Sequence, residues 1–412
     1  MTTSNAQTAF VWIWLPGEAD PVVAGRLEKH GDRLLFTYGQ SYRGREGAIP
    51  FSPLELPLKA GTFEPEGMNI VHPCLRDAAP DAWGRRVVEY KNNDLKAAAD
   101  ELDYMMLSGS DRIGALDFQE SSTEYQPRGL GHPDLNQLLE AVSLLEQNEP
   151  LPPELDRALL HGSSVGGARP KALINDADQQ HIAKFSSTTD THNVVKGEYA
   201  AMRLAKLACI DVAEVSLQKS LNKDVLLVRR FDRYCTDKGV CRRAMLSGLS
   251  LLGLNEMEPQ YASYQDLADL IRQRFDKPRE TLHELYRRLI FNILIGNTDD
   301  HARNHAAFWD GDRLKLTPAY DLCPIMHTGQ EATQVMQLGG AEGNHSTLTN
   351  VLSICASFQL DEYTARDVIN TLLDCVEVNW SVVCDEAEMT DIERNRLWQR
   401  AILNPYCLQG WE

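Results

Sequence analysis

The sequence has none of the long apolar segments that membrane proteins need. No uninterrupted apolar run approaches about 18 residues. The first residues carry neither a basic cluster nor a long apolar stretch, so no secretory signal is predicted. The sequence therefore predicts no membrane-spanning helix and no membrane partner.

Paired cysteine motifs are also missing. The nine cysteines are scattered, odd in number, and form no Cys-x-x-Cys pair. This pattern favours reduced thiols over disulfides or a zinc site. We therefore expect a cytoplasmic protein.

Basic residues are scarce relative to acidic ones, with 41 Lys and Arg against 59 Asp and Glu and a net charge of -18. Extended binding of nucleic-acid phosphates needs clustered Lys and Arg, so little direct nucleic-acid binding is predicted. The sequence shows no internal repeat. Its 412 residues predict two or three globular domains.

Local patterns change along the chain. Residues 10–118 are β-rich, with candidate strands at 11–15, 22–27 and 33–38 separated by turn residues. Two polar clusters, at 80–86 and 110–116, are interpreted as Asp and Arg pairs that hold turns, with a catalytic role as the alternative. A helix is predicted at 133–146, and the sequence is mostly helical after residue 243.

An acidic loop follows a buried apolar helix. Residues 289–296 are apolar and end at Gly296, and Asp299 is then followed by Asn304 five positions later. This spacing is that of a protein-kinase catalytic loop. There the Asp accepts the proton of the substrate hydroxyl and the Asn holds a metal ion. The alternative is an ordinary Asp-rich turn.

A predicted hairpin supplies a second acidic residue. Asp310-Gly311 separates two apolar runs, which is a strong hairpin signal. The hairpin should return Asp321 to the start of the loop, so that Asp299, Asn304 and Asp321 converge as a base and two Mg²⁺ ligands. Alternatively, Asp321 caps a turn. Asp300 is interpreted as a solvated or loop-bracing residue.

A small-residue loop at 162–171 could bring backbone amides close to phosphate oxygens. The alternative is a flexible surface loop. Lys184 lies within an apolar strand and needs an anionic partner if it is buried, unless it points to solvent from an edge strand. Glu198, on the following helix, is either an ordinary exposed Glu or the partner of Lys184 in the Lys and Glu set that a kinase uses. The strand at 224–233 is either a crossing between lobes beside an adenine or a plain core strand.

These motifs together resemble the HipA-type serine/threonine kinases of bacterial toxin–antitoxin systems. The residues that carry the resemblance are 163–171, 182–185, 230–233, 296–304 and 320–322, with 81–86 and 111–116 matching the amino-terminal subdomain. The resemblance implies an α+β fold: a two-lobed protein-kinase-like fold with an extra N-terminal β-rich subdomain. The expected boundaries are 1–118 for that subdomain, 119–235 for the kinase N-lobe with the phosphate loop, and 236–412 for the mostly helical C-lobe.

The resemblance also implies ATP and Mg as cofactors and assigns site residues. Asp299 would be the catalytic base, supported by His301, and Asn304 and Asp321 would be the metal ligands. The implied ATP contacts are Gly166, Gly167, Ala168, Arg169, Lys171, Lys184, Arg229, Arg230, Phe231, His301, Arg303, Asn304, Tyr320 and Asp321, with Glu198 in support. Autophosphorylation would fall on Ser164, or alternatively on Ser163, and expel the phosphate loop.

The implied partners are a helix-turn-helix antitoxin (HipB-like), operator DNA through that antitoxin, and a protein substrate such as an aminoacyl-tRNA synthetase. The sequence departs from the best-known toxin after Arg243, where it reads Ala-Met-Leu-Ser instead of an acidic, Gln-containing segment. This leaves the substrate and the toxicity open. The alternatives are a non-toxic nucleotide-binding corepressor that acts with the antitoxin, and a small-molecule or lipid kinase.

Overall fold

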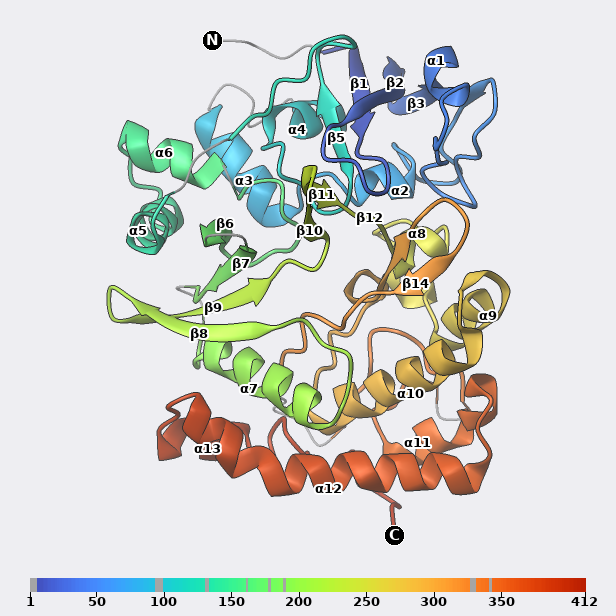
Figure 1. The fold of residues 1–412 in the computed structure, drawn as a ribbon. Coiled ribbons are helices and arrows are strands. Elements are labelled where there is room, and N and C mark those ends of the chain that lie inside the picture. The colour runs from blue at the N-terminus through green and yellow to red at the C-terminus, as the bar shows by residue number, and fades with distance from the viewer. Residues whose placement is uncertain are drawn as a thin grey trace. The chain divides into compact units, whose positions relative to one another are not determined.

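The structure is a computed structural model that describes residues 6–92, 99–129, 133–160, 162–176, 179–187, 190–326, 331–340 and 343–412. The chain divides into two compact units (Figure 1). The first comprises residues 1–188, 218–246 and 308–312, and the second comprises residues 189–217, 247–307 and 313–412. Within the described ranges, no helix is both long enough and apolar enough to cross a membrane.

The first unit begins with an antiparallel sheet of order β4-β3-β2-β1-β5. Its strands are β1 (Thr8–Ile13), β2 (Val22–His30), β3 (Arg33–Tyr38), β4 (Thr62–Phe63) and β5 (Leu116–Gln119). Along β3, Leu34, Phe36 and Tyr38 are buried and alternate with more exposed residues, as expected for a strand with one face on a core. The β-rich character predicted for residues 10–118 is confirmed.

Short helices accompany this sheet and lead to a second one. They are α1 (Gln40–Arg43), α2 (Pro73–Arg76), α3 (Ala82–Lys91), α4 (Glu101–Leu107), α5 (Leu135–Glu146) and α6 (Pro153–Leu160). The helix predicted at 133–146 begins at Leu135, because the Asp134 side chain caps it and Gln137 completes a capping box.

The second sheet has the order β6-β7-β9-β8. Its strands are β6 (Lys171–Asp176), β7 (Gln179–Phe185), β9 (Lys223–Arg229) and β8 (Val215–Ser220), and a hairpin of β10 (Arg233–Thr236) and β11 (Gly239–Arg242) follows. One apolar core joins α3, α5 and α6 to β6, β7 and β9, and it includes Trp83, Leu138 and Phe185. The polar cluster at 80–86 therefore begins a helix whose apolar face is packed on this sheet.

Arg112 of the polar cluster at 110–116 forms a fully buried ion pair with Asp117, the residue that follows the cluster. Arg112 and Asp117 are both 0% exposed, and the Arg112 Nε atom donates to Asp117 Oδ1 at 2.7 Å. The guanidinium also donates to the Ala78 carbonyl at 3.0 Å and to the Ser108 hydroxyl at 2.9 Å. The structural interpretation of this cluster is therefore the correct one.

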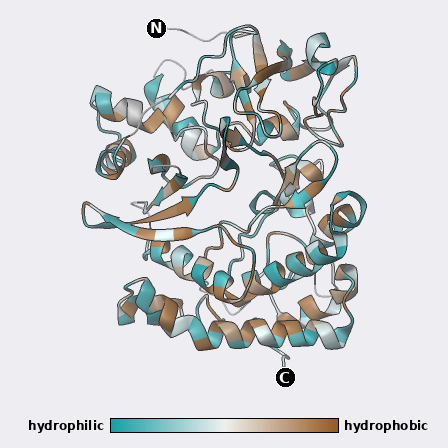
Figure 2. Cartoon of the chain, viewed as in Figure 1, coloured by the Kyte–Doolittle hydropathy of each residue, from teal (hydrophilic) through white to brown (hydrophobic). Residues whose placement is uncertain are grey.

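The second unit is mainly helical. Its elements are α7 (Val194–Leu207), α8 (Gly248–Leu251), η2 (Pro259–Tyr261), α9 (Tyr264–Arg274), α10 (Pro278–Leu294), η3 (Ala302–Asn304), β14 (Leu314–Leu316), α11 (Leu348–Ser353), η4 (Cys355–Phe358), α12 (Glu362–Glu386) and α13 (Asp391–Leu397). The long α12 packs against α7 and α10. Hydrophobic and hydrophilic residues alternate along α12 in Figure 2, and its buried residues recur at helical spacing.

Two further short strands adjoin β14. The sheet order is β12-β13-β14, with β12 at Ala244–Ser247 and β13 at Ala306–Trp309. The predicted hairpin around Asp310 and Gly311 is confirmed, since β13 and β14 are neighbouring strands.

Removing the cation of the buried pair should destabilise the first unit strongly. We expect Arg112→Met to lower the free energy of unfolding by about 3–5 kcal/mol, because Asp117 would stay buried without its main counter-charge. Urea denaturation followed by circular dichroism measures this. Lys238→Met is the control, since it breaks an exposed pair with Glu18 and should leave stability nearly unchanged.

The same pair predicts an acid dependence. Burial by itself raises the pKa of Asp117, but the charges of Arg112 and Arg128 outweigh burial and hold that pKa below its usual range. A depressed folded-state pKa contributes stability above the unfolded value of about 3.9, and this contribution is lost as the pH falls further. The acid-induced loss of stability should therefore be smaller in Arg112→Met; an equal loss would contradict this assignment.

Candidate active site

Loop 163–171 connects α6 to β6 and begins with two buried serines. The Ser163 hydroxyl donates to the Leu160 carbonyl at 2.9 Å and accepts from the Gly109 amide at 3.1 Å. The Ser164 hydroxyl donates to the Asp111 carbonyl at 3.1 Å. Ser163 is 0% exposed and Ser164 is 1% exposed, so neither hydroxyl is accessible in this conformation.

The middle of the loop is held by a carboxylate. Gly167 has φ of 107°, a conformation that favours glycine, and its amide donates to Asp81 Oδ2 at 2.8 Å. Asp81 also accepts from Arg76 Nη2 at 3.1 Å. Gly166 and Gly167 are half-buried, whereas Ala168 and Arg169 are exposed. The loop tip is thus open to solvent while its base is fixed.

Two lysines lie opposite each other beside this loop. In the antiparallel pairing of β6 and β7, Lys171 is in register with Lys184, which places both side chains on one face of the sheet. The Lys171 ammonium donates to the Gly166 carbonyl at 2.5 Å. The predicted contacts of the two lysines with nucleotide phosphates stay predictions. The edge-strand alternative for Lys184 is wrong, because β7 lies between β6 and β9.

Arg230 follows β9 and forms ion pairs with two neighbouring carboxylates. Its side chain is 0% exposed, and it donates to Asp111 Oδ1 at 2.8 Å and to Asp232 Oδ2 at 2.8 Å. Burial raises the pKa of Asp232, but Arg230 and Arg233 outweigh burial and bring it down to about 2. The guanidinium of Arg230 is therefore occupied by protein groups, and a nucleotide contact at this position would have to use its backbone.

The residues on either side of Arg230 differ from it. Arg229 is exposed at the end of β9. Phe231 is half-buried and its ring contacts Phe308 edge-on, with the ring centroids 5.9 Å apart. Both side chains lie at the surface of the first unit, so their predicted contacts with a nucleotide remain predictions.

In the second unit, loop 297–304 follows the C-terminal end of helix α10. The C-terminal half of α10 is buried, and the helix ends before Gly296, where φ is 67°. A side chain on Gly296 would approach the Ala401 carbonyl to 2.5 Å, so only glycine fits this close approach. Asn297 then bonds back to Asn292 through backbone and side chain, at 2.8 and 3.0 Å. The sequence signals for the end of this helix are confirmed.

The two adjacent carboxylates of the loop lie in opposite environments. Asp299 is exposed, whereas Asp300 is only 1% exposed. Asp300 accepts hydrogen bonds from the Tyr264 hydroxyl and from His305 Nε2. The interpretation of Asp300 as a solvated residue is wrong, and the loop-bracing alternative is correct.

The candidate metal ligands lie on the same loop and on the segment after β14. Asn304 Nδ2 donates to the Asp299 carbonyl at 3.4 Å. The Tyr320 hydroxyl donates to the Arg303 carbonyl at 2.7 Å, which joins the segment carrying Asp321 to the residue before Asn304. Asp321 itself adopts φ of 60°. These contacts join Asn304 to the Asp299 backbone and Tyr320 to the Arg303 backbone, and the convergence of the Asp299, Asn304 and Asp321 side chains stays a prediction.

The donor set at this place suits magnesium. Asp321 and Asn304 offer a carboxylate and an amide oxygen, the oxygen ligands that Mg²⁺ prefers, and Mg²⁺ commonly takes its remaining ligands from water and substrate phosphates. The described part of the chain contains no group of three or more His, Cys, Asp and Glu side chains that could hold a metal ion. By type, Asn304 and Asp321 suit Mg²⁺, and their role as its ligands stays a prediction.

The remaining predicted residues occupy supporting positions. His301 precedes the turn η3, and its Nδ1 atom is buried without a hydrogen-bond partner in the described structure. Arg303 lies 3.5 Å from the Glu256 carboxylate. Glu198 is 4% exposed on α7, which Asn193 caps. Lys184 belongs to the first unit and Glu198 to the second, so their pairing remains a prediction.

Sequence reasoning missed several residues that hold these loops. Asp81 and Asp111 were placed in polar clusters, but their contacts with loop 163–171 cross more than 50 residues of sequence. Tyr264 carries no local signal at all, because its partner Asp300 lies 36 residues away. His305 could have been suspected from its place at the end of the loop.

Comparisons with known proteins agree with this geometry. A family model described as the HipA-like C-terminal domain matches residues 163–380, more than half of the chain. A second model, the HipA N-terminal domain, matches residues 14–119. The two matches include both loops and the polar clusters that contact loop 163–171.

Individual relatives are distant. The putative kinase Y4mE of Sinorhizobium fredii is 27% identical over 344 residues, which cover 75% of this chain and 76% of that protein. The serine/threonine-protein kinase toxin HipA of Shewanella oneidensis is 27% identical over 189 residues, 39% of this chain and 43% of that protein. The solved complex of HipA, HipB and operator DNA from Shewanella oneidensis MR-1 contains a chain of similar fold, with a TM-score of 0.68, 18% identity and coverage of 94% of this chain and 95% of that one.

Removing the carboxylate at Asp81 should loosen loop 163–171. In Asp81→Ala the Gly167 amide loses its acceptor, an expected local cost of about 1–3 kcal/mol. Hydrogen exchange of the loop amides, followed by mass spectrometry, should become faster. Glu64→Ala removes an exposed carboxylate of the same unit and is the control. Unchanged exchange in Asp81→Ala would show that the serine contacts alone hold the loop.

Proposed function

The chain belongs to the HipA family of kinases, and we propose on this basis that it is an ATP- and Mg²⁺-dependent protein serine/threonine kinase. The main support for the proposal is the contrast in exposure between the two adjacent carboxylates of loop 297–304. Asp299 is exposed beside Asn304, while the adjacent Asp300 is buried and hydrogen-bonded. One carboxylate is thus free to act on a substrate in a loop that the other fixes.

In this proposal Asp299 is the general base. It accepts the proton of a serine or threonine hydroxyl as the hydroxyl oxygen bonds to the γ-phosphorus of ATP and the bond to the ADP oxygen breaks. Loop 163–171 and the facing Lys171 and Lys184 hold the phosphates. Asn304 and Asp321 would hold the metal ion, which when bound neutralises charge on the phosphate oxygens.

The architecture that accompanies this function is a two-lobed kinase fold behind a β-rich amino-terminal subdomain. The proposed parts are residues 1–118, 119–235 and 236–412. The match of the HipA N-terminal domain to residues 14–119 and the helical character of the second unit support this division.

Autophosphorylation is proposed at Ser164, with Ser163 as the alternative. Both hydroxyls are buried in hydrogen bonds to protein groups, so the loop has to leave its site before either can accept a phosphoryl group. The cellular role proposed is that of a cytoplasmic toxin held by a HipB-like helix-turn-helix antitoxin on operator DNA, with a substrate such as an aminoacyl-tRNA synthetase. The fold shared with the HipA chain of the HipA–HipB–DNA complex supports this role.

The kinase proposal is tested by transfer of labelled γ-phosphate. Purified protein with Mg²⁺ and labelled ATP should incorporate label, and Asp299→Asn should lower the rate by about 10²- to 10⁴-fold because the base is lost. Ser164→Ala should remove the label if Ser164 is the acceptor, and Ser163→Ala is the matched control. ATP binding by the unsubstituted protein without any transfer would instead favour the corepressor alternative.

Toxicity is tested separately from activity. Expression of the chain without an antitoxin should arrest growth, and the Asp299→Asn chain should not. Normal growth with the active protein would contradict the toxin role while leaving the kinase proposal intact. A small-molecule or lipid kinase would phosphorylate neither itself nor proteins of a cell extract.

A further inference from the structure

We propose that Tyr264, Asp300 and His305 form a positioning triad that fixes loop 297–304 for phosphoryl transfer. The proposal rests on the proposed kinase function, since it concerns the geometry of Asp299. The triad residues themselves would not touch the substrate. They act by holding the backbone that carries Asp299.

The centre of the triad is a buried carboxylate with two donors. Asp300 is 1% exposed, and His305 Nε2 lies 3.0 Å from Oδ1 and 3.2 Å from Oδ2. The Tyr264 hydroxyl donates to Oδ2. A buried carboxylate is costly unless it is paired and hydrogen-bonded, so this geometry holds Asp300 in one orientation.

Tyr264 ties the triad to a rigid helix. It is the first residue of α9, it is 0% exposed, and its backbone amide donates to the Gln337 carbonyl at 2.9 Å. Its ring also contacts the His305 ring edge-on, with centroids 5.5 Å apart. The hydroxyl is therefore presented to Asp300 from a fixed point.

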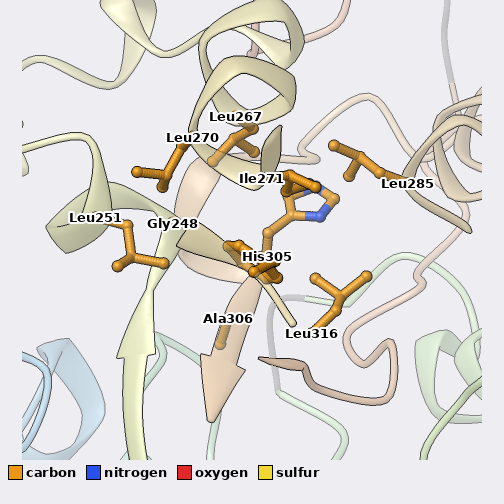
Figure 3. A pocket seen from close by; sticks show the side chains of 10 residues that line it. Gly248, Leu251, Leu267, Leu270, Ile271, Leu285, His305, Ala306 and Leu316 are labelled. Carbon is orange, nitrogen blue, oxygen red and sulfur yellow. The ribbon is translucent and has the colours of Figure 1, made fainter. Parts of the chain in front are cut away.

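His305 closes the loop from its other end. Its carbonyl accepts from the Gly248 amide at 2.6 Å at the start of α8. Behind the ring lies a small cavity of about 20 Å³ whose other walls are aliphatic and aromatic side chains, among them Leu267, Ile271 and Leu285 (Figure 3). This volume is room for about one water molecule, but an apolar site tends to stay dry.

On its Nε2 side, the His305 ring has Asp300 as its partner. Among the described residues, His305 Nδ1 has no hydrogen-bond partner. The hydrogen bond between His305 and Asp300 closes a six-residue segment, 300–305. Asp299 directly precedes this segment and Asn304 lies within it.

A loop closed in this way fixes the direction of Asp299. The side chains of Asp299 and Asp300 leave adjacent backbone positions toward opposite environments, so anchoring one sets the other. A misplacement of about 1 Å in a reacting group can cost about a hundredfold in rate. We infer that the triad preserves the rate of the chemical step and not the binding of ATP.

The test compares turnover with ATP affinity. Asp300→Asn and Tyr264→Phe should each lower kcat by about ten- to a hundredfold, with KM for ATP changed by no more than about twofold. In an Asp299→Asn background, Asp300→Asn should cause no further fall in the residual rate. If Asp300→Asn merely unfolded the protein, it would lower the rate both in the unsubstituted protein and in the Asp299→Asn variant.

Leu267→Ala is the matched control. It lies on α9 with Tyr264 and lines the same cavity, so it should lower Tm without removing a hydrogen bond of the triad. Its kcat should stay close to that of the unsubstituted protein. An equal loss of kcat in Leu267→Ala and Tyr264→Phe would overturn the triad, because general destabilisation would then explain both.

A readout without substrate separates the triad from the kinase proposal. Hydrogen exchange of the amides of residues 297–304 should be faster in Tyr264→Phe and unchanged in Leu267→Ala. Unchanged exchange in Tyr264→Phe would overturn the triad whatever the protein transfers. Faster exchange in a protein that transfers no phosphate would support the triad as a loop brace and overturn the kinase proposal. Full activity of Asp300→Asn beside an inactive Asp299→Asn would overturn the triad alone.

Discussion

A buried charge has to be paired, and this constraint shapes both units of the protein. In the first unit, Arg112 and Asp117 satisfy one another with no exposure to solvent, and Arg230 is enclosed by two carboxylates. In the second, Asp300 is buried between a phenol and an imidazole. Removing one partner from any of these buried groups would leave an uncompensated charge in the protein interior, which is strongly destabilising. The backbone segments that carry the partners are therefore held in place. Loop 163–171 contacts Asp111, which pairs with Arg230, and loop 297–304 contains Asp300.

Adjacent residues of identical chemistry show how far environment decides role. Asp299 and Asp300 are both carboxylates in one loop, yet one is exposed and the other is 1% exposed. The buried one accepts hydrogen bonds from Tyr264 and His305 and is out of reach of solvent. The exposed one is open to solvent. The difference in environment between Asp299 and Asp300 arises from Tyr264 on α9 and His305 at the end of the loop, and not from the residue type.

Sequence patterns predict the structural features that depend on neighbouring residues. They do not predict the burial or position of a side chain that depends on residues far away in the sequence. The end of α10 at Gly296, the hairpin around Gly311 and the β-rich amino-terminal region all follow from local patterns, and the structure has them. The spacing of Asp299 and Asn304 likewise identifies the loop. The burial of Asp300 does not follow, because Tyr264 is 36 residues away. The interior position of Lys184 was equally hidden, since it depends on β9 pairing with β7 across about 40 residues.

The serines of loop 163–171 are likewise buried by contacts with residues that are distant in the sequence, Gly109 and Asp111. The Ser164 hydroxyl donates to a backbone carbonyl, and the loop is 1% exposed at that residue. A phosphate group carries only acceptors at its oxygens and a charge near -2. It cannot replace the hydroxyl there, because the Asp111 carbonyl is itself an acceptor and the space is closed. A phosphorylated Ser164 would therefore break the contact with Asp111. Asp81 and Asp111, which hold loop 163–171, lie within the stretch matched by the HipA N-terminal domain, so the position of this loop depends on that domain.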